Sequence, residues 1–180
     1  RIAETRTEYV SDGLDELTLS ANPLDLFEKW ITEAEQRNPD TCNTVFLATV
    51  GPGSRPSGRI VLLRGYDERG FVFYTNYDSR KGNEINSNNK ASMTFFWNEM
   101  FRQVRIEGKV FILPDEESDQ YFSGRPRESQ IAALASGQSS ILQSRKNLEE
   151  RVRETEKLNE VREIARPSYW CGYFLSPLSI

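Results

Sequence analysis

Cationic and hydroxyl side chains gather at two places in the chain where they could bind an anion. Ser79-Arg80-Lys81-Gly82 stands at the start of a predicted helix, where free backbone N–H groups and two cations favour a phosphate or a carboxylate. Tyr121, Arg125 and Ser129 are spaced four residues apart, and an arginine with two hydroxyl groups is a phosphate-binding set. Each pattern also has a simpler interpretation. The first could be a solvated surface, and the second an ion pair where Pro126 breaks a helix.

Further polar residues stand at or near strand ends. Arg59 and Arg64 flank an apolar strand, and their odd separation predicts that they point to opposite faces. Gln103 and Arg105 alternate with apolar residues, so they lie on the polar face of another strand, where solvent contact would explain them equally well. Residues 138–140, Gln-Ser-Ser, form a polar loop, and the alternative interpretation is that they cap the next helix.

The absence of histidine removes several kinds of chemistry from this sequence. Ser-His-Asp and Cys-His nucleophiles, histidine general acid–base catalysis and histidine metal sites all need a residue type that the chain lacks. Cys42 and Cys171 are too few for a structural zinc site, and we interpret them as buried thiols of a cytoplasmic protein. No catalytic residue and no metal ligand is predicted. Two anion sites without acid–base machinery suit a protein whose chemistry belongs to a phosphorylated organic cofactor.

Length and charge predict one soluble domain. The chain has 180 residues, 37% of them hydrophobic, and a net charge of −4, which disfavours nucleic-acid binding. No apolar run approaches a membrane span of about 20 residues. Residues 1–20 read as an N-terminal arm and residues 21–180 as a single domain. The sequence starts at Arg1 rather than Met, which leaves open a targeting segment upstream.

Hydrophobic periodicity predicts a meander of strands with helices inserted late. We expect a helix at 23–36, a loop at 51–58, a helix opening at Pro114, further helices at 79–86, 129–135 and 143–160, and strands at 44–50, 59–64, 71–76, 91–97, 102–113 and 169–175. In the long strand, Val104, Ile106, Val110 and Ile112 should share one face, opposite Gln103, Arg105, Glu107 and Lys109. The fold class is therefore mainly β with added helices (α+β), arranged as a small antiparallel barrel.

Several motifs together resemble the pyridoxamine 5′-phosphate oxidase family. They follow the family's order and spacing from Arg6 to the end of the chain. The motifs are Arg59-Ile-Val-Leu-Leu-Arg-Gly, Phe71-Val-Phe-Tyr-Thr-Asn, Ser79-Arg-Lys-Gly, Arg102-Gln-Val-Arg-Ile-Glu-Gly, Tyr121-Phe-Ser-Gly-Arg-Pro-Arg-Glu-Ser-Gln-Ile and Gln138-Ser-Ser. The resemblance implies a homodimeric FMN-binding split β-barrel. It also implies oxidation of pyridoxamine 5′-phosphate or pyridoxine 5′-phosphate to pyridoxal 5′-phosphate by O2, with release of H2O2, in vitamin B6 biosynthesis and salvage.

The resemblance also implies roles for individual residues. The FMN contacts would be Arg59, Ile60, Val61, Leu62, Tyr74, Thr75, Arg80, Lys81, Gln103, Gln138 and Ser139, with Arg59 and Gln103 coming from different subunits. The substrate contacts would be Arg6, Tyr9, Arg64, Tyr121, Arg125 and Ser129.

Two departures from the family pattern keep alternatives open. Arg64 stands where the family usually has lysine, and a planar guanidinium sits differently on a phosphate. The family also continues past the equivalent of Ile180 with a Trp and an Arg-Leu-His-Asp-Arg motif, so we expect the domain to be C-terminally incomplete. The alternatives are a catalytically impaired flavin- or pyridoxal-phosphate-binding protein, and another split-barrel flavin reductase.

Overall fold

The computed structural model describes residue 4, residues 13–15, residue 17 and residues 19–180. Most of the predicted arm, including Arg6 and Tyr9, lies outside these residues. The described helices are α1 (Pro23–Arg37), α2 (Arg80–Ser87), α3 (Asp115–Ser123), α4 (Arg127–Ala135) and α5 (Arg145–Leu158). The described strands are β1 (Thr44–Gly51), β2 (Arg55–Leu62), β3 (Gly65–Asp67), β4 (Gly70–Asn76), β5 (Lys90–Trp97), β6 (Arg102–Ile112) and β7 (Trp170–Ser179).

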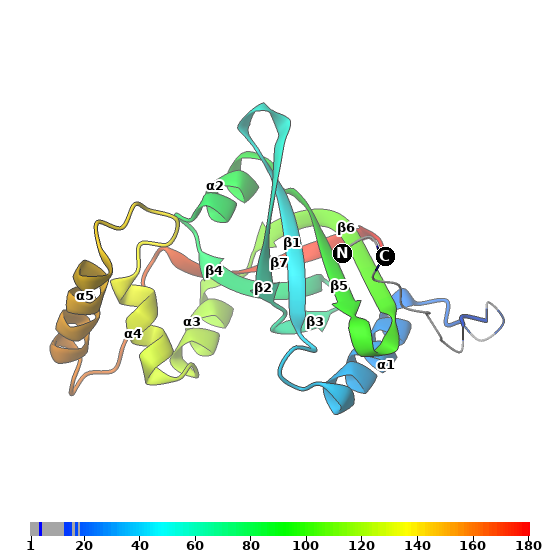
Figure 1. Ribbon diagram of the computed structural model, residues 1–180, viewed down its shortest axis with the longest axis horizontal. Coiled ribbons are helices and arrows are strands. Elements are labelled where there is room, and N and C mark those ends of the chain that lie inside the picture. Colours follow the sequence, from blue (N-terminus) through cyan, green and yellow to red (C-terminus); the bar gives the residue numbers. More distant parts are fainter. Residues whose placement is uncertain (1–3, 5–12, 16, 18) are drawn as a thin grey trace.

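The strands form one strongly bent sheet in the order β2-β1-β5-β6-β7-β4-β3 (Figure 1). Every neighbouring pair is antiparallel. β2 also contacts β4 near the far end of this order, so the sheet curls toward a barrel. Helix α1 lies below the sheet, and α3, α4 and α5 gather on one side of it (Figure 1). The predicted class, mainly β with added helices, is confirmed.

Two predicted boundaries around the second strand are wrong. The loop expected at 51–58 is only a short 3₁₀ turn at Pro52–Ser54, and β2 already begins at Arg55. Pro56 favoured a loop in the sequence pattern. However, β2 is an edge strand of the sheet, and an edge strand tolerates a residue without an N–H. β2 also stops at Leu62, and the chain crosses to the short strand β3, which the pattern did not predict.

The long strands follow the predicted alternation except near their ends. Val104, Ile106 and Val110 on β6 are buried, whereas Ile112 at the end of the strand is 53% exposed. β7 runs to Ser179, four residues beyond the predicted end. Pro177 is accommodated beside an irregularity in the β6 register at Glu107 and Gly108.

Helix α1 closes one end of the barrel. Its N-cap Asn22 accepts a hydrogen bond from the backbone N–H of Leu24, and Pro23 takes the first turn, as predicted. Phe27 is 1% exposed and meets Phe71 and Phe95 edge to face, with ring centroids 4.9 and 5.2 Å apart. This end is therefore filled by side chains, which leaves the opposite, helix-flanked side for a ligand.

The late helices pack around a second, smaller core. This cluster lies beside the start of β7 and consists of Phe122, Ile131, Ile164 and Trp170. Cys42 and Cys171 are free, buried thiols, as the sequence predicted. None of the helices in the described part of the chain combines the length and apolar character that crossing a membrane requires.

Candidate functional site

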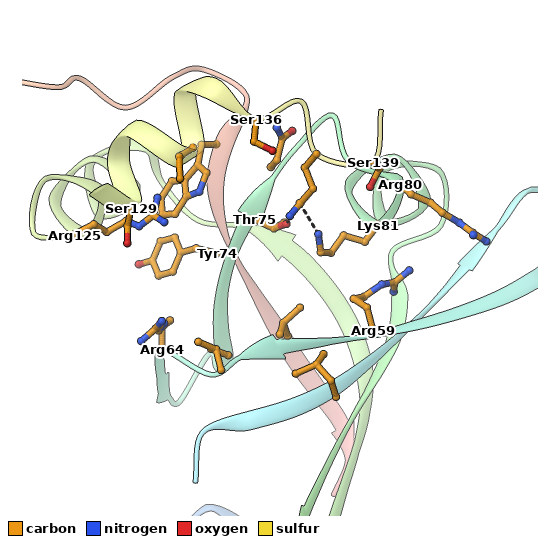
Figure 2. Close-up of a pocket in the computed structure, with 18 of the residues that line it drawn as sticks. Arg59, Arg64, Tyr74, Thr75, Arg80, Lys81, Arg125, Ser129, Ser136 and Ser139 are labelled. Atoms are coloured by element: carbon orange, nitrogen blue, oxygen red, sulfur yellow. Dashed lines mark hydrogen bonds between the residues drawn. The ribbon is translucent and has the colours of Figure 1, made fainter. Parts of the chain in front are cut away.

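A cleft of about 790 Å³ separates the barrel wall from the late helices (Figure 2). β2 and β4 form its wall, the start of α2 one end, and α3, α4 and the following loop the other side. Its volume falls within the range of pockets for small molecules and cofactors. It brings together most of the residues that the sequence singled out: Arg59, Ile60, Val61, Leu62, Arg64, Tyr74, Thr75, Arg80, Lys81, Tyr121, Arg125, Ser129, Gln138 and Ser139.

Among the described residues, one predicted contact, Gln103, is not part of this lining. Gln103 is an exposed residue of β6, paired with Phe96 of β5 on the outside of the barrel. Arg6 and Tyr9 lie outside the described residues, so their roles stay predictions.

The start of α2 has the features of a helix end that could bind an anion. Ser79 caps the helix by accepting a hydrogen bond from the backbone N–H of Gly82, and Arg80 and Lys81 follow directly. A Cβ at Gly82 would lie 2.0 Å from the carbonyl oxygen of Tyr77, so only glycine lets the helix start approach the preceding turn this closely. The predicted helix start is therefore correct.

Lys81 reaches the loop after α4. Its Nζ donates to Oε1 of Gln138 at 2.7 Å, and the Thr75 hydroxyl donates to the same oxygen at 3.1 Å. Burial, together with the nearby Arg59 charge, lowers the pKa of Lys81 to about 8. The interpretation of Arg80 and Lys81 as a solvated pair thus fails for Lys81, which is 8% exposed.

Gln138 and Ser139 do not cap the next helix, because Ser144 does so. Ser139 instead adopts a left-handed backbone conformation, with φ 68°, on the rim of the cleft. A non-glycine residue held in that region marks a loop whose shape the surroundings impose.

Arg59 is held against the barrel wall by a dense set of acceptors. Its guanidinium donates to the Thr49 hydroxyl at 2.6 Å, the Ser57 hydroxyl at 2.5 Å and Oε2 of Glu84 at 3.1 Å. Oε1 of the same carboxylate accepts from Nε of Arg80 at 2.8 Å. Burial by itself would raise the pKa of Glu84, but hydrogen bonds from the Ser57 and Thr49 hydroxyls and from Arg80 and Arg59 outweigh it and lower the pKa to about 2.

Sequence reasoning missed Glu84. Its position four residues after Arg80 is a typical helix ion-pair spacing, which was the available signal. That spacing does not predict the contact with Arg59, which lies on a different element.

Arg125 lies at the other end of the cleft without a carboxylate partner among the described residues. Its guanidinium lies over the rings of Trp170 and Phe122, 4.7 and 5.5 Å from their centroids. Its Nη1 is buried and has no hydrogen-bond partner. Burial lowers the pKa of Arg125, an effect that Tyr121 partly offsets and Arg64 reinforces. The alternative of an ion pair at the helix break is therefore wrong.

Three parallel rings support this end. Tyr74 stacks on Tyr121 with centroids 3.9 Å apart, and on Trp170 with centroids 5.2 Å apart. Trp170, which lines the cleft, is the second residue of the site that sequence reasoning missed. Its position in a predicted strand gave no indication that its ring would face the helices.

The prediction that Arg59 and Arg64 point to opposite faces is wrong. Arg64 lies beyond the end of β2, where its backbone N–H donates to Val72 of β4, so strand alternation no longer sets its direction. Both arginines consequently line the cleft.

The helix carrying Tyr121 ends at Ser123 and a new one begins at Arg127, yet Tyr121, Arg125 and Ser129 still converge on the cleft.

The cleft therefore has two cationic ends joined by an apolar and aromatic wall. Arg59, Arg80 and Lys81 mark one end, and Arg64 and Arg125 the other (Figure 2). Such a site can hold an elongated molecule with one anionic group, or two molecules with one anion each. In the described part of the chain, no three His, Cys, Asp or Glu side chains cluster in a way that could hold a metal ion.

Comparisons with known proteins agree on one family. A family model described as "Pyridoxamine 5'-phosphate oxidase" matches residues 31–159. The chain is 46% identical to the pyridoxine/pyridoxamine 5′-phosphate oxidase of Leptospira biflexa, over 99% of this chain and 84% of that protein. It is 48% identical to the protein of the same name from Rhizobium meliloti, over 92% of this chain and 80% of that protein.

Solved structures share the fold. PhzG from Burkholderia lata, crystallised with tetrahydrophenazine-1-carboxylic acid, is 30% identical with a TM-score of 0.86, covering 93% of this chain and 83% of that one. A pyridoxamine 5′-phosphate oxidase-related FMN-binding protein from Nostoc punctiforme superposes with a TM-score of 0.67 at 18% identity, over 89% of this chain and 84% of that one. These matches confirm the predicted split β-barrel.

Proposed function

The chain belongs to the pyridoxamine 5′-phosphate oxidase family, and we propose that it is an FMN-dependent oxidase of pyridoxamine 5′-phosphate and pyridoxine 5′-phosphate. The product would be pyridoxal 5′-phosphate, with O2 as acceptor and H2O2 released. The observation that carries the proposal is Nη1 of Arg125, which is buried and has no hydrogen-bond partner among the described residues, in a cleft that has a second cationic end. A buried cation without a partner is costly, and a phosphate would satisfy it.

The residues of the cleft fit a flavin mononucleotide. Arg80 and Lys81 at the capped helix start suit its phosphate, and the exposed side chains of Ile60 and Leu62 offer an apolar surface to a ring system. Thr75 and Gln138 add hydrogen-bonding groups, and Thr75 and Lys81 already donate to the same oxygen of Gln138. When bound, the flavin would supply a two-electron acceptor that takes a hydride from the substrate and passes the electrons to O2.

The protein's own part in the reaction is positioning. Arg125, Tyr121 and Ser129 would clamp the substrate phosphate, and Arg64 would add charge from the barrel side. An arginine at position 64 keeps the charge that the family's lysine provides and adds a planar fork. With the phosphate fixed, the substrate carbon that loses hydride is held in one place, and orientation of this kind lowers the barrier without a strong base.

We also propose that the enzyme is a homodimer whose cleft is completed by a second copy. Phe46 on β1 and Ile60 on β2 are directly opposite in register and 44% and 59% exposed, and Phe96 on β5 is 58% exposed. An apolar face of this kind is typical of an interface. Gln103 pairs with Phe96, so the interface would bring it toward the partner's flavin. Light scattering should give twice the chain mass; a stable flavin-loaded monomer would contradict the dimer.

The decisive assay supplies FMN and pyridoxine 5′-phosphate in air and follows pyridoxal 5′-phosphate and H2O2 together. The oxidase should form them in a one-to-one ratio, and unphosphorylated pyridoxine should react poorly. A flavin- or pyridoxal-phosphate-binding protein would form neither product. A flavin reductase would turn over only with a reduced nicotinamide or deazaflavin donor.

The two free thiols, Cys42 and Cys171, support a reducing compartment such as the cytoplasm.

A further inference from the structure

A buried carboxylate stands behind the cations at the α2 end of the cleft. The side chain of Glu84 is 5% exposed and does not line the cleft, whereas Arg59 and Arg80, which it binds, both do. Each of its oxygens holds a different arginine, so one side chain fixes guanidinium groups from β2 and α2. A Cβ at Gly51 would lie 3.1 Å from Oε1 of Glu84, so the neighbouring hairpin leaves just enough room for it.

We propose that Glu84 is a positioning residue for the flavin phosphate, acting through Arg80 and Arg59; this inference rests on the flavin site proposed above. Arg80 is the informative partner, because its side chain is 65% exposed and long enough to adopt many rotamers. Binding through Nε restricts the stem while leaving the two terminal nitrogens of the guanidinium available to an anion. Glu84 therefore reduces the entropy that Arg80 would lose on binding phosphate.

Glu84 could instead weaken phosphate binding by repulsion. Two observations favour positioning. Glu84 lies outside the cleft lining, so the guanidinium groups stand between it and a bound anion. With Lys81 also present, three cations face one carboxylate, and the end of the cleft keeps a net positive charge.

The chain contains a matched control for this pair. At the start of α5, Ser144 caps the helix, and Nε of Arg145 donates to Oε1 of Glu149 at 2.8 Å, the same distance and spacing as in the Arg80–Glu84 pair. The Glu149 side chain is 54% exposed, and neither Arg145 nor Glu149 lines the cleft. Glu149→Gln thus makes the same chemical change away from the site.

The test compares the affinities for FMN and riboflavin, which differ only by the phosphate, in variants of the full chain. In Glu84→Gln the amide oxygen can still accept from Thr49, Ser57 and Arg59, but the NH₂ group then faces Nε of Arg80, and two donors cannot bond. We expect FMN to bind about three- to tenfold more weakly, and riboflavin to change by less than twofold. Glu149→Gln should change neither affinity.

A double-variant cycle separates positioning from other roles. Arg80→Ala should reduce the preference for FMN over riboflavin, and in that background Glu84→Gln should have no further effect on it. Glu84→Asp keeps the charge but shortens the side chain, so it should also lower the preference for FMN over riboflavin. If Glu84 acted only by repelling the phosphate, relieving that repulsion would not lower this preference. Glu84→Asp serves as the second variant if Glu84→Gln folds poorly in thermal melts.

Four results would overturn the inference. Glu84→Gln could bind FMN as tightly as the unaltered protein or more tightly, it could weaken both flavins equally, or its effect could persist without Arg80. Glu84→Asp could also leave the preference for FMN unchanged. A different result, an Arg80→Ala variant that keeps the full preference for FMN, would refute the flavin-phosphate site itself and the inference with it.

Discussion

The sequence Ser-Arg-Lys-x-x-Glu occurs at the starts of both α2 and α5, and the two copies have different surroundings. In each, the serine caps the helix and the arginine binds the glutamate through Nε at 2.8 Å. At α5 the Arg145 and Lys146 side chains are 91% and 81% exposed. At α2 the lysine is buried and the glutamate also holds Arg59, from a strand.

If α2 binds the flavin phosphate as proposed, the motif alone is not enough to make an anion site. An exposed charge is solvated and screened, so its interaction with an anion is weak. The same charge at the buried wall of a cleft is partly desolvated, and an anion replaces the water it has lost. The barrel wall behind α2 therefore distinguishes the two helix starts, and the following experiments test that distinction.

The largest expected effect comes from removing the two cations at each helix start. Arg80→Ala combined with Lys81→Ala should weaken FMN binding about a hundredfold or more, because each charge-assisted hydrogen bond contributes about 1.5–3 kcal/mol. Arg145→Ala combined with Lys146→Ala should leave the affinity unchanged. Flavin fluorescence quenching measures both variants. Equal losses in the two would show that net charge, rather than position, governs binding.

Arg125 extends the comparison to a cation that has no carboxylate partner in the described part of the chain. Arg125→Ala should weaken binding of pyridoxal 5′-phosphate about ten- to a hundredfold, because it removes a charge-assisted contact to the phosphate. Unphosphorylated pyridoxal should bind nearly as before, and FMN affinity should hardly change. The control is Arg153→Ala on the exposed face of α5. A variant that keeps its preference for the phosphorylated ligand but melts earlier would assign Arg125 to the fold rather than to substrate binding.

Periodicity and capping residues predicted most elements of the fold, because those signals are local. The α2 start could be predicted from Ser79 and its two cations, and the strands from alternation. The contact between Glu84 and Arg59 could not, since it depends on how β2 lies across α2. Arg64 was misplaced for a related reason: its direction follows from where the strand ends, and the crossing to β3 obscured that boundary. Local patterns indicated the two anion sites, the family resemblance added the other cleft residues, and tertiary packing determined their partners.

The lysines of the two helix starts should differ in their response to pH. Lys81 has a pKa of about 8 in the flavin-free protein, so most of its charge is lost between pH 7 and pH 9. A phosphate binds the charged form, and FMN affinity should therefore fall about tenfold over this range. Lys81→Met should flatten this part of the pH profile, whereas Lys146→Met should not alter it. An unaltered profile in Lys81→Met would assign the pH dependence to another group.

The lowered pKa of Lys81 should make stability rise with pH, whereas it should make FMN affinity fall. Because folding lowers the pKa of Lys81 from its ordinary 10.5 to about 8, the unfolded chain binds more protons between those values. The contribution of Lys81 to the free energy of unfolding should thus rise with pH over that window. Thermal melts of the flavin-free protein, compared with Lys81→Met, measure this contribution as the difference between the two pH profiles.

The smallest expected effect concerns the rings that hold Arg125. Trp170→Phe keeps an aromatic face but weakens the cation–π contact by about 1 kcal/mol or less, so pyridoxal 5′-phosphate should bind about two- to fivefold more weakly. Trp97→Phe makes the same change in the barrel core, where Trp97 Nε1 donates to the backbone oxygen of Cys42. That control should lower the melting temperature without changing the preference for a phosphorylated ligand. If Trp170→Phe also leaves this preference intact, the ring supports only the fold. Loss of preference with a small change in melting temperature would show that aromatic faces hold Arg125 in place, as a carboxylate holds Arg80.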